Sequence, residues 1–120
     1  MHIPSEWNFN GKVIFIINGL SFSATSYFAG IARSNDRGVF VGEETGGAYY
    51  GGSSGEIYRT VLPNSNIRLN IPKDVYANPE KSIGAKDRGV IPDYIVIPSI
   101  RDIIKNRDVQ LNYALELVGN

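Results

Sequence analysis

The segment 12–42 constrains the fold most, because its hydrophobic pattern changes period twice. Residues 12–17 (KVIFII) form an apolar run rich in β-branched side chains, which is typical of a strand buried on both faces of a parallel sheet. From Ser23 to Ser34 the apolar residues recur with helical spacing, at positions 24, 27, 28, 31 and 32. Residues 39–42 (VFVG) form a second short apolar run. We therefore predict a strand–helix–strand unit with parallel strands and a right-handed crossover.

The predicted helix has recognisable ends. Ser23 or Ser21 is a natural N-cap, and residues 35–38 (NDRG) are typical of a helix stop. Gly30 lies inside the helix, where glycine costs about 1 kcal/mol relative to alanine. We expect this glycine to permit close packing against a neighbouring segment.

The middle of the chain predicts a β-hairpin. Residues 45–55 (TGGAYYGGSSG) are expected to form a glycine-rich loop. Apolar and polar side chains alternate in residues 57–62 and again in 67–71, and residues 63–66 (PNSN) have the composition of a turn. Residues 72–89 contain prolines and glycines without periodicity, and we expect them to be irregular.

The last part of the chain predicts one strand and two helices. Residues 94–97 (YIVI) have the composition of a strand, and residues 99–102 (SIRD) resemble a capping box that opens a short helix. Asp108 is expected to cap a final helix that ends at Gly119. Its apolar residues share one face, at positions 111, 114, 115 and 118. The predicted class is α/β with a β-hairpin excursion and C-terminal helices.

Composition excludes several function classes. The chain has 120 residues, which suggests one domain over residues 11–120 after a leader or linker at residues 1–10. Twelve Lys and Arg balance twelve Asp and Glu, so the chain has no electrostatic footprint for nucleic acid. With no cysteine and one histidine, His2, it lacks the usual zinc ligands, and we expect no metal and no cofactor. No apolar run approaches the roughly 20 residues that span a bilayer.

Ser23 is the first candidate for chemistry, since it lies where a buried strand turns into a helix. There its hydroxyl would be close to free backbone N–H groups and the positive end of the helix dipole, which favours a nucleophilic serine. The N–H of Ala24 could donate to an oxyanion. The alternative is that Ser23 is only the N-cap of the helix.

The other candidates are glycines, acids and one imidazole. Gly46 and Gly47 could line a peptide or phosphate site, or could form a simple turn; they are not a P-loop, since no Gly-Lys-Ser/Thr follows. Glu43, Glu44, Glu80 and Asp87 could each orient a base, although carboxylates are mostly solvated. His2 would have to fold back to Ser23 to act as a general base. The cluster Lys81, Lys86 and Arg88 favours a solvated surface.

The order of these motifs resembles the C-terminal processing (tail-specific) and tricorn-type serine peptidases. The resemblance runs from about Gly11 to about Val118 and rests on an ordered set of motifs: FSATS at 22–26, FAG at 28–30, VGEETGG at 41–47 and GVIPD at 89–93. It implies a Clp-protease/crotonase-like fold, with Ser23 as the nucleophile and Ala24 N–H as one oxyanion donor. It also implies a peptide or protein substrate and an extracytoplasmic location.

Two departures from the family pattern qualify what the resemblance implies. The Ser/Lys peptidases of this family have a Gly-Lys step where this chain has Gly47-Ala48, so the lysine base is absent. The Thr-Gly-Gly sequence resembles the tricorn-like branch, in which a histidine and a second oxyanion amide come from an N-terminal segment. The acid of that branch precedes the GVIPD motif, which makes Asp87 the candidate, although Lys86 falls closest to the expected position.

We therefore expect this chain to be the C-terminal, nucleophile-bearing part of a serine endopeptidase, with little activity alone. A serine without a base is a poor nucleophile near neutral pH. Such a part would leave apolar surface uncovered, so we also expect a homo-oligomer or pairing with an N-terminal half. The alternatives are a non-catalytic module that binds peptides or partners, and a crotonase-like enzyme that acts on acyl thioesters.

Overall fold

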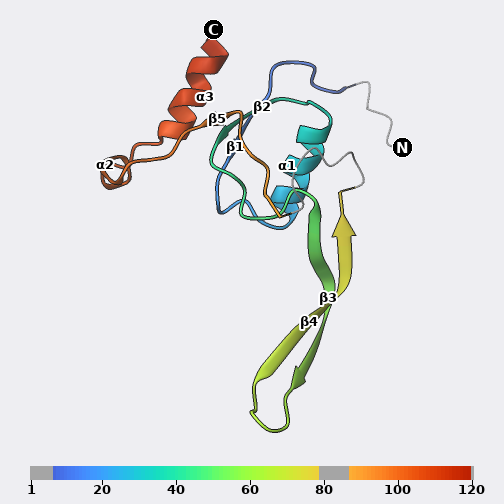
Figure 1. The fold of residues 1–120 in the computed structure, drawn as a ribbon. Coiled ribbons are helices and arrows are strands. Elements are labelled where there is room, and N and C mark those ends of the chain that lie inside the picture. Colours follow the sequence, from blue (N-terminus) through green and yellow to red (C-terminus); the bar gives the residue numbers. More distant parts are fainter. Residues whose placement is uncertain (1–6, 79–86, 120) are drawn as a thin grey trace.

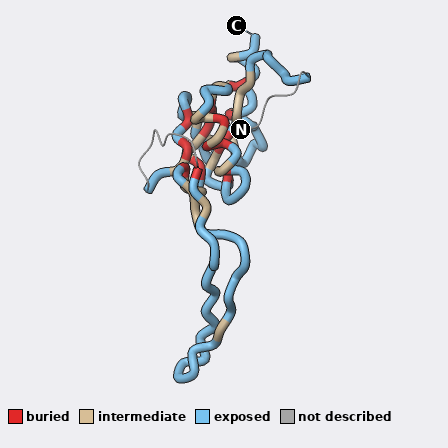
Figure 2. The backbone as a smooth tube through the Cα atoms, turned by 90° about the vertical axis from the view of Figure 1, so that its right-hand side faces the viewer, coloured by how far each residue is buried: buried red, intermediate tan, exposed pale blue. Residues whose placement is uncertain are grey.

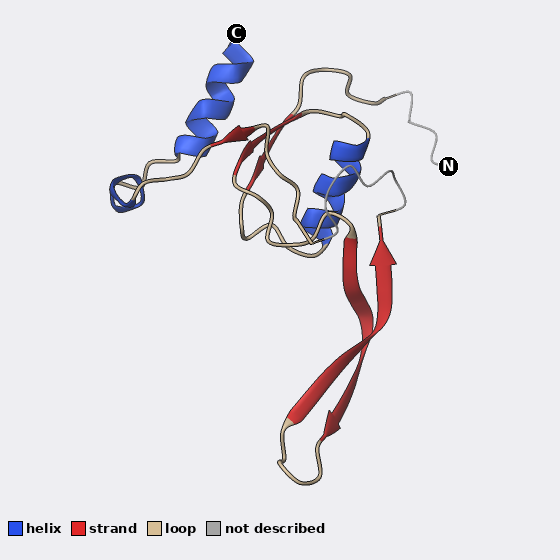
Figure 3. Ribbon diagram, in the orientation of Figure 1, coloured by secondary structure: helices blue, strands red, loops and turns tan. Residues whose placement is uncertain are grey.

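The structure is a computed structural model that describes residues 7–78 and 87–119, and it is a mixed α/β fold (Figure 3). Strands and helices alternate in the first part of the chain, a long hairpin follows, and the last part has one strand and two helices. In chain order they are β1 (Ile14–Ile17), α1 (Ala24–Ser34), β2 (Val39–Gly42), β3 (Gly51–Val61), β4 (Arg68–Ala77), β5 (Tyr94–Ile95), α2 (Ile100–Ile104) and α3 (Val109–Gly119).

The predicted strand–helix–strand unit is confirmed. Strands β1 and β2 pair in parallel, with Ile14 opposite Val39, and α1 connects them. Strand β5 adds to the other side of β2, also in parallel, so the sheet order is β1-β2-β5. All three carboxyl ends therefore meet at one edge of the sheet, which is where open α/β sheets hold their functional groups.

Burial of β1 on both faces was a wrong expectation. Ile17 is buried, but Ile16 on the opposite face is 41% exposed. The face of Ile17 is covered by Ala29 and Ala32 of α1, and α3 also contacts β1 and β2 (Figure 1). A single helix of this length leaves part of the strand open to solvent.

The core lies between the sheet and α1, and small residues of the helix form it. Phe40 is fully buried and stacks on Phe15 with the ring centroids 4.7 Å apart. On α1 the buried residues are Ser26, Ala29, Gly30 and Ala32. The predicted apolar face was therefore wrong in part, because Phe28 is 60% exposed and the backbone approaches closely at Gly30 instead. A side chain at Gly30 would meet the amide of Asn78 and the ring of Tyr49, so the expected close packing is confirmed.

The hairpin is present and is longer than predicted. Strands β3 and β4 pair antiparallel from Gly51 opposite Ala77 to Val61 opposite Arg68, with one irregularity between Ser54 and Ile57. Residues 51–55 and 72–77, which were expected to be loop and irregular, belong to these strands. The glycines and Pro72 are tolerated because each strand has one free edge and the ladder is already interrupted near them.

The two faces of the hairpin differ in composition. Directly opposite residues share a face, and the pairs Tyr58–Ile71 and Thr60–Leu69 alternate with Arg59–Asn70 and Val61–Arg68. One face therefore presents an apolar row, formed by Tyr58, Leu62, Ile67, Leu69 and Ile71, which we call the apolar face of the hairpin. All five residues are exposed, and the hairpin stands clear of the rest of the molecule (Figure 2).

The C-terminal elements follow the prediction closely. The capping box is present at Ser99, which accepts from Asp102 N–H while the Asp102 carboxylate accepts from Ser99 N–H. Asp108 caps α3 by accepting the N–H of Leu111 at 2.9 Å. Strand β5 is shorter than predicted, although Val96 N–H still donates to the carbonyl of Gly42 at 2.9 Å. Only Gln110 and Ala114 of α3 are buried.

Candidate active site

Ser23 adopts an unusual backbone conformation between β1 and α1. The turn before it is held by Asn18, whose carbonyl accepts Ser21 N–H at 2.9 Å and whose side chain accepts Leu20 N–H at 2.9 Å. Ser23 then has φ 52° and ψ −123°, a region that L-residues rarely adopt. Such a conformation costs on the order of 1–3 kcal/mol and persists only where the surroundings enforce it.

The Ser23 side chain does not behave as an ordinary N-cap. Ser23 occupies the N-cap position of α1, but its hydroxyl makes no capping hydrogen bond. An N-cap serine normally has an extended backbone and accepts an N–H from the first turn, and Ser23 does neither. Ser21 is no substitute, since its hydroxyl accepts from Asn18 N–H at 3.2 Å. The expected capping role is therefore wrong, and the exposed Ser23 hydroxyl is unengaged by the described residues.

The amide of Ala24 lies directly beside this hydroxyl. Ala24 is the first residue of α1, and its N–H has no acceptor among residues 7–78 and 87–119. It belongs to the first turn of the helix, where backbone N–H groups lack intrahelical partners and the dipole favours negative charge. A free hydroxyl next to a free amide can perform attack on a carbonyl and stabilise the resulting oxyanion.

Gly46 and Gly47 pack directly onto the turn that contains Ser23. Gly47 N–H donates to the carbonyl of Ser21 at 3.1 Å. A Cβ atom on Gly46 would overlap the carbonyl oxygen of Gly19, and one on Gly47 would overlap the hydroxyl of Ser26. Glycine is therefore required at both positions by close approach of the backbone, and the structure places the loop beside Ser23.

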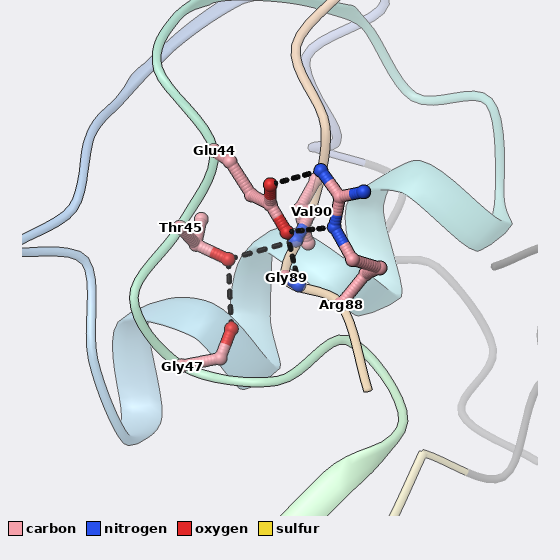
Figure 4. A network of polar contacts seen from close by, with 6 residues as sticks. All are labelled: Glu44, Thr45, Gly47, Arg88, Gly89 and Val90. Atoms are coloured by element: carbon pink, nitrogen blue, oxygen red, sulfur yellow. Dashed lines mark hydrogen bonds and ion pairs between the residues drawn. The ribbon is translucent and has the colours of Figure 1, made fainter. Parts of the chain in front are cut away.

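A network of polar contacts, which we call the clasp, joins residues 44–47 of this loop to residues 88–90, which follow the hairpin (Figure 4). Glu44 accepts two side-chain hydrogen bonds from Arg88, at 2.9 and 2.5 Å, and the N–H of Gly89 at 2.7 Å. These contacts, those from Arg88 foremost, lower the pKa of Glu44 from 4.5 to about 2. Thr45 accepts Val90 N–H at 2.8 Å and donates to the carbonyl of Gly47 at 2.8 Å. The loop that contains Gly46 and Gly47, which we call the glycine loop, is thus held by residues more than forty positions away in the sequence.

Asp93 belongs to the GVIPD motif and has a structural role. The sequence analysis assigned no role to this residue. Its carboxylate pairs with Arg33 of α1 at 2.6 Å and accepts Phe40 N–H at 2.8 Å. Arg33 also donates to the carbonyl of Ile91 at 2.7 Å and lies over the Phe40 ring. Asp93 therefore ties the motif to both the helix and the sheet. The motif itself was the only signal that could have found it.

Of the candidate acids and the candidate base, Asp87, Glu80 and His2, the structure describes only Asp87. Asp87 is exposed and influences Arg88 electrostatically, but no hydrogen bond joins it to Ser23. Glu80 and His2 lie outside the described residues. The described ranges contain no histidine, and no group of three or more metal-ligating side chains occurs within them.

Two surface hollows lie near the clasp. The first, of about 350 Å³, is lined by Arg33, Tyr49 and residues 88–91 among others. The second, of about 320 Å³, lies at the carboxyl ends of the strands, next to Gly19, Glu43 and Ile97. Ser23 lines neither of these two hollows. None of the helices described is long and apolar enough to cross a membrane.

Comparisons with known proteins assign the chain to a family. A comparison with curated proteins found no match. The crystal structure of a candidate peptidase from Parabacteroides merdae aligns with 95% of this chain at 27% identity and a TM-score of 0.59. The chain covers 34% of that structure and so spans about a third of its length. The model of peptidase family S41 matches residues 2–96, which is most of the sequence. The chain therefore belongs to peptidase family S41, a family of serine peptidases of the ClpP/crotonase-like fold.

Proposed function

We propose that Ser23 is the nucleophile of a serine endopeptidase to which this chain contributes the nucleophile-bearing part. The observation that supports this proposal most is the strained backbone of Ser23, with φ 52° and ψ −123°, combined with a hydroxyl free of any capping bond. Strain of this kind in a non-glycine residue is concentrated at functional sites. A serine kept only for helix capping would need neither feature.

The chemistry would be acyl transfer. The Ser23 oxygen attacks the carbonyl carbon of a peptide bond, and its proton passes to a general base. The negative charge that develops on the carbonyl oxygen is stabilised by Ala24 N–H. When the C–N bond breaks, the amine takes the proton from the base, and water then hydrolyses the ester in the same way.

The general base is the part of this machinery that the described residues do not supply. The proposal therefore assigns it to a group outside residues 7–78 and 87–119: His2, or another segment or chain. Loss of a general base costs on the order of 10⁴ to 10⁶ in rate in triad enzymes. Asp87 remains our candidate for the acid that orients the base, on the family resemblance, and Gly46 and Gly47 for a loop beside the substrate.

A serine-directed fluorophosphonate probe tests this assignment. The protein is expressed from its complete natural reading frame, as wild type and as Ser23→Ala, and labelling and hydrolysis of an unstructured peptide are measured. We expect both to be lost in Ser23→Ala and to persist in Ser54→Ala, which changes an exposed hydroxyl of the hairpin. Labelling that survives in Ser23→Ala would reject Ser23 as the nucleophile. Ser23-dependent cleavage by these 120 residues alone would reject a base from another chain or from a segment beyond them, and would leave His2 as the candidate base.

A second candidate is a binding module with the same fold, and the exposed apolar surface favours it. Leu20, Ile100 and Ile104 are each more than three-quarters exposed, as is Val75 of the hairpin. Surface of this kind typically marks an interface. We propose that it is covered by a second copy of the chain or by another part of a longer peptidase. An extracytoplasmic location is likewise a proposal that rests on the family.

A further inference from the structure

Ser26 is a completely buried polar residue whose hydroxyl has a single, well-defined role. Its exposed fraction is 0%, and it lies on the inner side of the first turn of α1. The hydroxyl donates to the carbonyl oxygen of Ser23 at 2.8 Å. The same carbonyl oxygen also accepts Tyr27 N–H at 3.0 Å, so two donors fix its direction.

The direction of that carbonyl also sets the direction of the oxyanion donor. The carbonyl group of Ser23 and the N–H of Ala24 belong to one peptide unit, which is planar and trans, so the two point in opposite directions. A donor that holds the Ser23 oxygen therefore aims the Ala24 N–H the opposite way, out of the helix. Hydrogen bonds to a carbonyl also polarise the attached amide and strengthen its N–H as a donor.

The glycine loop keeps Ser26 in this arrangement. Gly47 approaches so closely that a Cβ atom there would overlap both Oγ and Cβ of Ser26. The Ser26 hydroxyl is thus enclosed and has no contact with solvent. The loop is itself held by the clasp through Thr45, which donates to the Gly47 carbonyl.

We propose that Ser26 is a positioning residue, which aims the Ala24 N–H at the oxyanion by holding the Ser23 peptide unit. This inference rests on the proposed function, in which Ser23 is the nucleophile. Removal of a whole oxyanion donor costs about 10²- to 10³-fold in kcat. Since Tyr27 N–H still holds the same carbonyl, we expect Ser26→Ala to lower kcat about tenfold with KM unchanged.

The experiment compares three variants of the protein expressed from its complete natural reading frame. Ser26→Ala removes the donor, and Ser26→Cys keeps the size of the side chain with a weaker donor. Ser34→Ala is the matched control, because Ser34 donates to the Gly30 carbonyl at 2.8 Å in the last turn of the same helix. Measurements are kcat, KM, the rate of fluorophosphonate labelling, the pH profile, and affinity for a peptide aldehyde, whose adduct oxygen occupies the oxyanion position.

We expect Ser26→Ala to lower kcat, labelling rate and aldehyde affinity by a similar factor, and Ser26→Cys to recover part of the loss. The pH profile should keep its midpoint, since the base is unchanged. Equal activity in Ser26→Ala and wild type, or an equal loss in Ser34→Ala, would overturn the positioning role while leaving Ser23 as the nucleophile. Labelling that does not depend on Ser23 would instead overturn the proposed function itself.

Discussion

At the scale of single residues, Ser23 and Glu44 show what a sequence can and cannot indicate. The pattern of a strand run followed by helical spacing was sufficient to place Ser23 at the junction. It was insufficient to predict the positive φ of Ser23, because Gly46 and Gly47, which pack on this turn, come from another segment of the chain. Glu44 was only one acid among several, since its partner Arg88 is 44 positions away.

The clasp predicts an acid-sensitive contribution to stability at Glu44. Its pKa is about 2 in the folded protein and 4.5 ordinarily, so the contribution is present above pH 4.5 and is lost as the pH falls toward 2. The pair is partly exposed, so we expect Glu44→Gln to cost only on the order of 1 kcal/mol at pH 7. The loss of stability in Glu44→Gln is measured from the urea unfolding midpoints of the variant and the wild type at pH 7, 4.5 and 3.

The matched control for that measurement is Glu56→Gln. Glu56 pairs with Lys73 on the hairpin at 2.6 Å, and its side chain is 78% exposed. The difference between Glu44→Gln and wild type should shrink from pH 7 to pH 3. A difference that is constant with pH would contradict the ion pair as its source.

At the scale of elements, the type and the order of the helices and strands were predictable from the sequence. The length of each strand and the face of each helix that is buried were not. The strand–helix–strand unit, the hairpin and the capping box at Ser99 follow from local patterns, and each is present. The buried face of α1 could not be read from periodicity, because Ser26 and Gly30 are buried by close backbone approach rather than by apolarity. The length of β3 was underestimated because cross-strand pairing with β4 overrides the low strand propensity of its glycines.

Strand β2 and strand β4 should respond very differently to loss of a large side chain. Phe40 of β2 is fully buried between Phe15 and Arg33, so Phe40→Ala should cost about 3–5 kcal/mol. Leu69 of β4 is exposed on the hairpin, so Leu69→Thr should change stability by less than about 0.5 kcal/mol. Chemical denaturation measures both, and a large effect at Leu69 would mean that the hairpin packs on the body.

At the scale of the whole molecule, the chain is extended and leaves many apolar side chains exposed to solvent. Its radius of gyration is 18.1 Å, where a compact domain of this length has about 14 Å. The hairpin projects away from the sheet, and α2 stands off on the opposite side with its isoleucines exposed (Figure 1). The sequence analysis expected uncovered apolar surface, but it could not indicate which residues would form it, since the same apolar residues would be buried if the segments folded back.

This shape predicts self-association of the chain through the apolar face of the hairpin. We expect light scattering to show a mean mass that rises with concentration, and expect Ile71→Lys to reduce this rise. Asn70→Lys is the matched control, because it adds the same charge at the next residue on the opposite face. A monomer at all concentrations, or an equal effect of both variants, would contradict association through that face.

The hairpin also determines how this chain can change in length. Since β3 and β4 contact mainly each other, growth at their tip leaves the sheet and the turn at Ser23 untouched. Side chains alternate with a period of two, so two residues inserted in each strand extend the apolar row. One residue inserted in each would transfer every side chain beyond it to the other face. Viable insertions near residues 63–66 should therefore come in matched, even numbers.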